Sequence, residues 1–256
     1  MSETKNEIPQ VIQEITQDQI RQQNQETTLK ILNQNSEIKK MINTISENHQ
    51  LNNFEDKSNI PIPFSLIERN KTDIFLQSQI VTEYQKLVKQ INSPKLAFEY
   101  PFILVGHQQT DPDGYQYIVF NELVHTQKDA TILEKNEVEH DPNKIRQALK
   151  KGDVIALGHT HPYLTDKETS NYFTNKINPD IKDEYHIKRI GLNLSLQDIY
   201  NGIQLKRGLP NKNVYSCLIM YNGEIGLIDH NQNSITKANN IIGVTEKEII
   251  NIPSPN

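Results

Sequence analysis

Hydrophobic residues follow a helical period in several parts of the chain. Apolar side chains from Ile74 to Ile91 recur at i, i+3/i+4 and i+7. This spacing predicts a helix that is capped by Asp73 and ended by Asn92-Ser93-Pro94. Two further helices are predicted, at residues 143–151 and 195–206.

Other apolar runs are short and predict strands. They lie at residues 102–105, 115–120, 153–157, 213–221 and 224–228. The pair Asn222-Gly223 between the last two runs is typical of a β-hairpin. Helices interleaved with strands predict an α/β fold, in which a mixed β-sheet is sandwiched by helices.

The front of the chain has a different pattern. The first 60 residues contain 18 Asn and Gln and no Gly. Ile31, Ile38 and Ile45 recur every seven residues, as in a coiled-coil seam, but Gln34 and Asn48 occupy alternate positions of the repeat. Residues 1–58 are therefore predicted to be a helical or disordered extension, with a weak seam through which the protein could oligomerise.

Prolines divide this extension from the α/β part. Pro61 and Pro63 favour extended backbone, which predicts a linker at residues 59–70. The α/β domain then spans residues 71–232. Residues 233–256 read as a C-terminal tail with one short strand near Ile241 and Ile242.

Composition excludes several classes of protein. A net charge of −5 argues against nucleic-acid binding, which requires clustered basic residues. No apolar run approaches the roughly 20 residues of a membrane helix, and no secretory signal opens the chain, so we expect a soluble cytoplasmic protein. The single cysteine, Cys217, lies mid-strand as a small buried hydrophobe. Any bound metal must therefore use histidine and carboxylate ligands.

Candidate metal ligands follow the strand predicted at 153–157. In extended backbone the side chains of His159 and His161 share one face, with roots about 6–7 Å apart, so their ring nitrogens can converge on one Zn²⁺. The alternative interpretation is that two polar residues simply close a strand.

Two carboxylates could complete such a site. Asp198 lies in the first turn of a predicted helix and could be the third ligand, although Ser195 and Asp198 also form an ordinary capping pattern. Glu99 stands just ahead of the strand at 102–105 and could accept a proton from zinc-bound water. Its alternative role is that of a solvated residue at a strand entry.

These residues together resemble the JAMM (MPN-plus, JAB-domain) zinc metallopeptidases. That family combines a Glu opening a strand that ends in Gly, a His-x-His-Pro motif, and Ser-x-x-Asp. The matching segments here are Glu99 to Gly106, Gly158-His159-Thr160-His161-Pro162, and Ser195-Leu196-Gln197-Asp198. The resemblance covers residues 70–232 and implies a JAB/MPN-like, cytidine-deaminase-like architecture.

The spacing departs from the compact family pattern at one place. Residues 163–194 form a polar stretch that reads as an inserted loop before Ser195. The usual short spacing would reach Ser170, which has no aspartate three residues later, so Ser170 with Asp166 is the alternative pair. His186 in the same stretch could also approach the metal, or be a solvated loop residue.

The resemblance implies a function. Zn²⁺ on His159, His161 and Asp198, Glu99 as general base and Ser195 as oxyanion donor would hydrolyse a peptide or isopeptide bond. The substrate would be a protein or peptide, with ubiquitin-like proteins as one option. The alternatives are a non-catalytic JAB/MPN-type scaffold or binding module, and a secreted toxin or effector that uses the same hydrolase domain.

Overall fold

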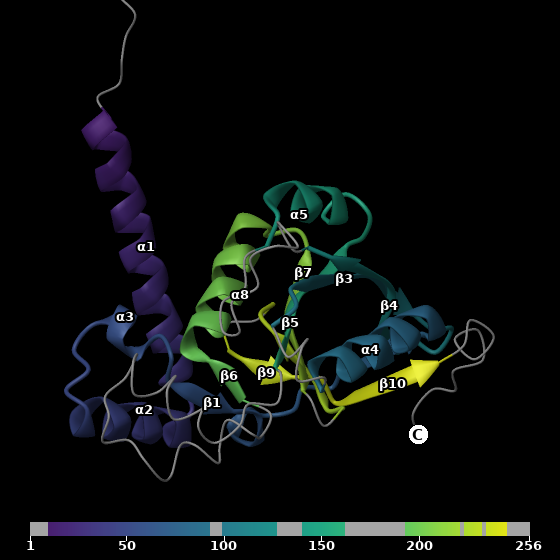
Figure 1. Cartoon of the computed structure of the whole chain (residues 1–256), viewed down its shortest axis with the longest axis horizontal. Helices are drawn as coiled ribbons and strands as arrows, with labels where there is room; N and C mark the ends of the chain where they lie inside the picture. Colours follow the sequence, from purple (N-terminus) through teal and green to yellow (C-terminus); the bar gives the residue numbers. More distant parts are fainter. Residues whose placement is uncertain are drawn as a thin grey trace, which may run out of the picture.

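The computed structural model describes residues 10–92, 99–126, 140–161, 193–220, 223–231 and 234–244. A mixed eight-stranded sheet lies at the centre of the molecule, with helices packed around it (Figure 1). Its strands are β2 (Asp73–Gln77), β3 (Phe102–Thr110), β4 (Gln116–His125), β5 (Val154–His161), β7 (Asn213–Met220), β8 (Ile225–Asp229), β9 (Thr236–Lys237) and β10 (Asn240–Val244). They are arranged in the order β10-β2-β4-β3-β5-β7-β8-β9. The predicted α/β class is confirmed.

The remaining elements surround this sheet. The helices are α1 (Gln10–Leu32), α2 (Ser36–Asn48), α3 (Phe54–Lys57), α4 (Ser78–Ile91), α5 (Pro142–Ala148) and α8 (Leu196–Gly208), with a 3₁₀ turn η1 (Phe64–Leu66). A separate two-stranded sheet pairs β1 (Pro61–Pro63) with β6 (Asn193–Ser195). None of the helices in the described ranges is long and apolar enough to cross a membrane.

The two faces of the central sheet bury different hydrophobic clusters. Helix α4 covers one face, where Ile80 and Leu87 pack against strand residues such as Phe102. Helix α8 covers the opposite face together with the N-terminal helices, and its Leu196 and Ile199 share a cluster with Leu218. Side chains alternate between these faces along each strand, so the face that a residue occupies can be read from the pairing.

The predicted helix at 73–91 begins later than the sequence pattern indicates, and the prediction that Asp73 caps it was wrong. Residues Asp73–Gln77 form strand β2, which pairs in parallel with both β4 and β10. Ile74, Phe75 and Leu76 are all buried, because a parallel strand between two neighbours is covered on both faces. Such a continuous apolar run cannot be distinguished from a buried helix start by periodicity.

The N-terminal segment packs onto the α8 side of the sheet. Ile38, Ile42 and Ile45 of α2 are buried in the same cluster as the helix α8 residues, so the heptad isoleucines of α2 contact this chain itself. The heptad does not run along one helix, because α1 ends at Leu32 and α2 begins at Ser36. Oligomerisation through residues 1–58 stays a prediction.

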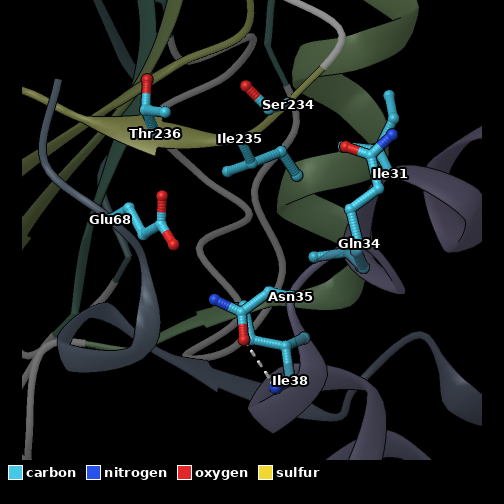
Figure 2. Close-up of a pocket in the computed structure, with 9 residues that line it drawn as sticks. Ile31, Gln34, Asn35, Ile38, Glu68, Ser234, Ile235 and Thr236 are labelled. Carbon is cyan, nitrogen blue, oxygen red and sulfur yellow. Dashed lines mark hydrogen bonds between the residues drawn. The ribbon is translucent and has the colours of Figure 1, made fainter.

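Residues 59–70, predicted as a linker, contribute buried side chains to this core. Ile60, Ile62, Phe64 and Ile67 all belong to the hydrophobic cluster of α8. The loop near Glu68 and the segment 234–236 also enclose, with the α1–α2 turn, a pocket of about 200 Å³ (Figure 2). Its lining mixes apolar and polar side chains and includes none of the candidate metal ligands.

Near the C-terminus the chain returns to both edges of the sheet. The short strand predicted near Ile241 and Ile242 is β10, which pairs in parallel with β2. Strand β9 pairs with β8 at the other edge. The division of the chain at residues 58, 70 and 232 stays a prediction, although β9 and β10 lie within the range assigned to the tail.

Candidate metal centre

Strand β5 carries both candidate histidines near the middle of the sheet. It pairs antiparallel with β3 and parallel with β7, so its backbone is fixed on both sides. His159 and His161 share a face and Thr160, fully buried, points the other way. The preceding Gly158 is required sterically, because a Cβ there would overlap the Phe102 ring.

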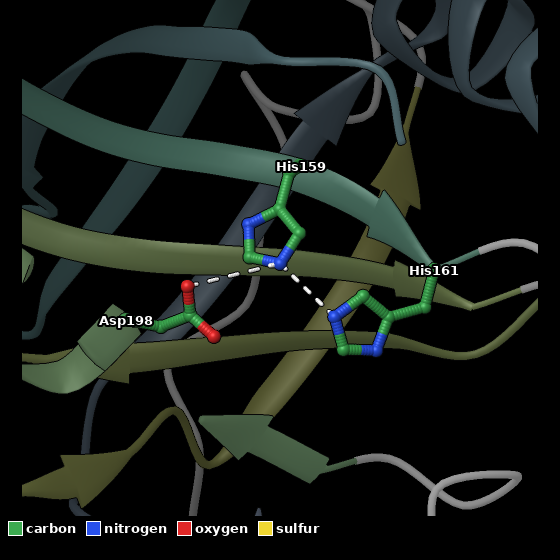
Figure 3. A group of neighbouring side chains, drawn as sticks. All are labelled: His159, His161 and Asp198. Atoms are coloured by element: carbon green, nitrogen blue, oxygen red, sulfur yellow. Dashed lines mark hydrogen bonds and ion pairs between the residues drawn. The ribbon is translucent and has the colours of Figure 1, made fainter. Parts of the chain in front are cut away.

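The two histidines and Asp198 converge although they come from elements far apart in sequence (Figure 3). The Nε2 atoms of His159 and His161 are 3.0 Å apart, and His159 Nε2 lies 3.9 Å from Asp198 Oδ1. One ligand atom from each of the three residues lies within 4.8 Å of the others. The side chains of His159 and Asp198 are 13% and 21% exposed, so the cluster is sheltered but open to solvent.

The donor set and spacing fit a zinc ion. Ligands of a tetrahedral zinc with bonds of 2.0–2.1 Å stand about 3.3 Å apart, between the two distances seen here. Two imidazole nitrogens and one carboxylate oxygen are ordinary zinc ligands, whereas calcium and magnesium prefer all-oxygen sites. The part of the chain that the structure describes therefore contains a cluster that could hold a metal ion, on His159, His161 and Asp198.

Asp198 is held in place by a capping box. Its Oδ2 accepts hydrogen bonds from the Ser195 backbone N–H, at 2.8 Å, and from the Ser195 hydroxyl, at 2.7 Å. The Ser195 Oγ in turn accepts from the Asp198 N–H at 3.1 Å. One carboxylate oxygen is thus committed to the helix start, while Oδ1 faces His159. Capping and ligation, posed as alternatives by the sequence, are compatible in this geometry.

The start of helix α8 is anchored to the segment before β1. Strand β6 pairs antiparallel with β1, with Ser195 opposite Pro61. The N–H groups of Leu196 and Gln197 donate to the carbonyls of Ile60 and Ser58, at 3.0 and 2.9 Å. Because the first N–H groups of a helix have no partner within it, these bonds fix the helix end that carries Asp198.

Glu99 lies three residues ahead of β3, the strand that pairs with the histidine strand β5. Phe102 pairs with Gly158, and the Tyr100 N–H donates to the Thr160 Oγ1 at 2.9 Å. The paired register begins at Phe102, and extending it by three residues would set Glu99 opposite His161. Only 8% of Glu99 is exposed, which differs from a solvated strand-entry residue.

The alternative ligands cannot be placed. Asp166, Ser170 and His186 lie outside the described residues, as do Pro162 and most of the 163–194 stretch. The single thiol, Cys217, is buried and unpaired on β7, and burial raises its pKa. It behaves as the small hydrophobe that the sequence predicts.

Two features near the centre carried no signal in the sequence. Ser58 and Ile60 bind the start of α8 through their backbone carbonyls, which no residue pattern marks. His140 lies close enough to His159 that their charges would repel, and this repulsion, with burial as the larger cause, lowers the pKa of His140 to about 4. A single histidine at the end of an unpatterned stretch gives no spacing that would predict such a position.

The chain was compared with models of protein families and with curated proteins. No family model matches the chain, and no curated protein is significantly similar to it. The resemblance to the JAMM metallopeptidases therefore depends on the residues and their arrangement.

Proposed function

We propose that this protein is a zinc-dependent hydrolase of peptide or isopeptide bonds, with a JAMM-type site on a JAB/MPN-like fold. The convergence of His159, His161 and Asp198 is the observation that supports the proposal. These residues match the second and third segments of the family pattern, and Glu99 of the first segment is buried just ahead of β3, which pairs with the histidine strand.

The metal would be held by His159, His161 and Asp198. A zinc ion bound there would supply Lewis acidity and would lower the pKa of a coordinated water toward 7. Glu99 takes the proton as the water oxygen bonds to the scissile carbonyl carbon. When the carbon–nitrogen bond breaks, Glu99 returns that proton to the leaving amine.

Ser195 would donate to the carbonyl oxygen as negative charge develops on it. Its one hydroxyl hydrogen is directed at Asp198 Oδ2, and it must rotate away to reach a substrate. The backbone N–H of Ser195 continues to hold Oδ2 during that rotation. A single oxyanion donor of this kind is worth about 2.7–4 kcal/mol in other hydrolases.

The substrate in this proposal is a protein or peptide, with a ubiquitin-like protein as one option. Residues 163–194, between the two parts of the site in sequence, are the natural candidate for substrate selection. A non-catalytic scaffold remains the competing function, and metal content separates the two.

Metal analysis of the purified protein is the first test. We expect one zinc per chain in the wild type, none in the double variant His159→Ala/His161→Ala, and full zinc in His107→Ala. His107 is an exposed histidine bonded to Asp153 and is a matched control. Absence of stoichiometric metal in the wild type would favour the scaffold.

A peptidase screen then tests the chemistry. Isopeptide-linked and linear amide substrates are offered to the wild type and to Glu99→Gln. The variant should keep its zinc and lose hydrolysis of any substrate that the wild type cleaves. Retained hydrolysis in Glu99→Gln would contradict the role of Glu99.

A further inference from the structure

A hydrogen-bonded pair, buried Thr126 and partly exposed His140, lies beside the candidate metal centre and has no role in the reaction described above. The Thr126 Oγ1 and His140 Nδ1 are 2.6 Å apart, and Thr126 is completely buried. The backbone carbonyl of Thr126 also accepts from the Asp141 N–H at 2.6 Å. Side chain and backbone thus both fix His140 to the end of β4.

Strand pairing shows which face this pair occupies. Phe102 pairs with Gly158 of β5 and with His125 of β4, so Pro101, one residue earlier, lies opposite His159 and opposite Thr126. The Thr126 N–H donates to the Pro101 carbonyl at 3.1 Å, which confirms this row. Residues directly opposite one another share a face, so Thr126 lies on the face of His159.

The position of His125 also indicates that Thr126 lies on the face of His159. It precedes Thr126 and points to the opposite face, where its Nε2 lies 3.7 Å from Glu83 of α4. His140, bonded to the Thr126 side chain, is therefore on the metal side of the sheet. Strands lie about 4.8 Å apart, so Thr126 stands two strand spacings, roughly 10 Å, from His159.

That separation suits a contact with substrate. His140 is not part of the cluster of His159, His161 and Asp198, whose ligand atoms all lie within 4.8 Å of one another. The spacing of roughly 10 Å between Thr126 and His159 corresponds to about three residues of an extended peptide, at about 3.3 Å per residue. A substrate chain crossing the centre toward β4 would pass His140.

The chemistry of the pair limits what it can bind. The imidazole is neutral near pH 7, because burial and His159 lower its pKa to about 4. The Thr126–His140 contact does not itself fix which atom donates, so the proposal assigns the Nε2–H tautomer, in which Nδ1 accepts from the Thr126 hydroxyl and Nε2 donates one hydrogen bond. Such a group recognises a carbonyl and gives no charge pairing to a carboxylate or phosphate.

We propose that His140, held by Thr126, is a substrate-binding residue that donates a hydrogen bond to a backbone carbonyl of a polypeptide flanking the scissile bond. This inference rests on the proposed hydrolase function. It adds a substrate-binding position on the β4 side of the metal and a requirement for an uncharged peptide backbone there.

Binding of metal-directed probes to the zinc-loaded full chain tests this without measuring hydrolysis. Acetohydroxamate reports on the metal alone. Two capped diglycine hydroxamates add a peptide backbone without side chains to this metal-binding group. In one the glycines extend from the acyl side of the hydroxamate, and in the other they extend from its amine side. For one of the two, His140→Ala should weaken binding about tenfold by calorimetry, the size of one hydrogen bond. Acetohydroxamate affinity and zinc content should not change.

Matched variants separate binding from folding. Thr126→Val should weaken the same diglycine probe, while Thr126→Ser, which keeps the hydroxyl, and His125→Ala on the other face should not. Equal affinity of both diglycine probes for wild type and His140→Ala overturns the inference and leaves the hydrolase proposal intact. Loss of acetohydroxamate binding in His140→Ala also overturns it, since His140 would then act on the metal. A wild type that binds no zinc overturns both proposals.

Discussion

The two halves of the candidate metal centre are positioned by different means. His159 and His161 come from one strand, β5, which is paired on both sides within the central sheet. Asp198 comes from the start of α8, which depends on the three-residue strands β1 and β6 and on the carbonyls of Ser58 and Ile60. The histidine half is local in sequence, whereas the aspartate half is assembled by segments more than 130 residues apart, from Pro61 to Ser195.

This difference indicates which half is easier to perturb. Central strands share their stability with the whole sheet, while a short two-stranded pair opens at lower cost. Substitutions near β1 and β6 should therefore weaken metal binding by moving Asp198, without affecting the pairing that holds the histidines.

Removal of the aspartate ligand should have the largest effect on the site. In Asp198→Asn the Oδ1 charge is lost, and we expect zinc affinity to fall more than 100-fold, beyond the 10–100-fold typical of outer-shell partners. Competition with a chromophoric chelator measures it. Asp153→Asn, which changes an exposed carboxylate bonded to His107, should leave zinc affinity unchanged. Wild-type affinity in Asp198→Asn would remove this residue from the ligand set and favour Asp166.

Weakening the anchor of β6 should have the next largest effect. Ile62 of β1 is fully buried, and Ile62→Ala should cost about 2–5 kcal/mol of unfolding free energy. Zinc affinity should fall about tenfold as Asp198 becomes less well held, within the range for outer-shell changes. Urea unfolding and chelator competition give the two quantities.

The control for this substitution lies on the other face of the sheet. Ile80 of α4 is equally buried, so Ile80→Ala should lose similar stability but keep zinc affinity. If both variants lose zinc affinity equally, global destabilisation rather than the β1–β6 pair is responsible.

Loss of the serine hydroxyl should produce a smaller change in stability and a specific change in the site. Ser195→Ala removes the N-cap of α8, at a cost of about 1 kcal/mol, and one of two bonds that hold Asp198 Oδ2. Any hydrolysis should slow by about 10²–10³-fold if Ser195 is the oxyanion donor. Ser195→Thr keeps the hydroxyl and should retain most of the stability. Unchanged hydrolysis in Ser195→Ala would leave Ser195 with capping alone.

Acid should loosen the aspartate half through His230. This residue lies under α8, where a Cβ on Gly202 would overlap its ring, and its Nε2 is 2.8 Å from Ser216 Oγ. Burial lowers its pKa to about 3 from 6.5, so the folded state contains neutral imidazole and the unfolded state gains a proton first. The resulting stability is complete above pH 6.5 and is lost as pH falls toward 3, by at most about 1.4 kcal/mol per pH unit.

Urea unfolding at pH 7.0 and 5.5 measures this slope. In His230→Gln, which stays neutral, the pH dependence should be shallower than in the wild type. Parallel slopes for the two proteins would show that His230 does not contribute. His140 titrates in both proteins and cancels in the comparison.

The sequence predicted the elements of the fold in which the hydrophobic residues follow a single helical or strand period. The hairpin of β7 and β8, helix α8 with its Ser195 cap, and the strand carrying the histidines all follow from local patterns. The start of α4 did not, because the buried run of β2 resembles a helix. The heptad of Ile31, Ile38 and Ile45 does not form one helix, because a turn separates α1 from α2. The isoleucines of α2 pack into the core of this chain instead of forming a coiled-coil seam.

The sequence by itself determined the donor types and the local geometry of each half of the site. One buried cysteine limits the ligands to nitrogen and oxygen, strand alternation puts His159 and His161 on one face, and a capping pattern places Asp198 in the first turn of a helix.

Only the tertiary structure decided that these halves meet. The pairing of β1 with β6 bridges residues too far apart for any periodic pattern to specify, and it brings Asp198 to 3.9 Å from His159. The pairing of β3 with β4 and β5 placed Thr126, and with it His140, on the face of the histidines. Periodicity specifies which way a side chain points within its own element, whereas long-range hydrogen bonding determines what it faces.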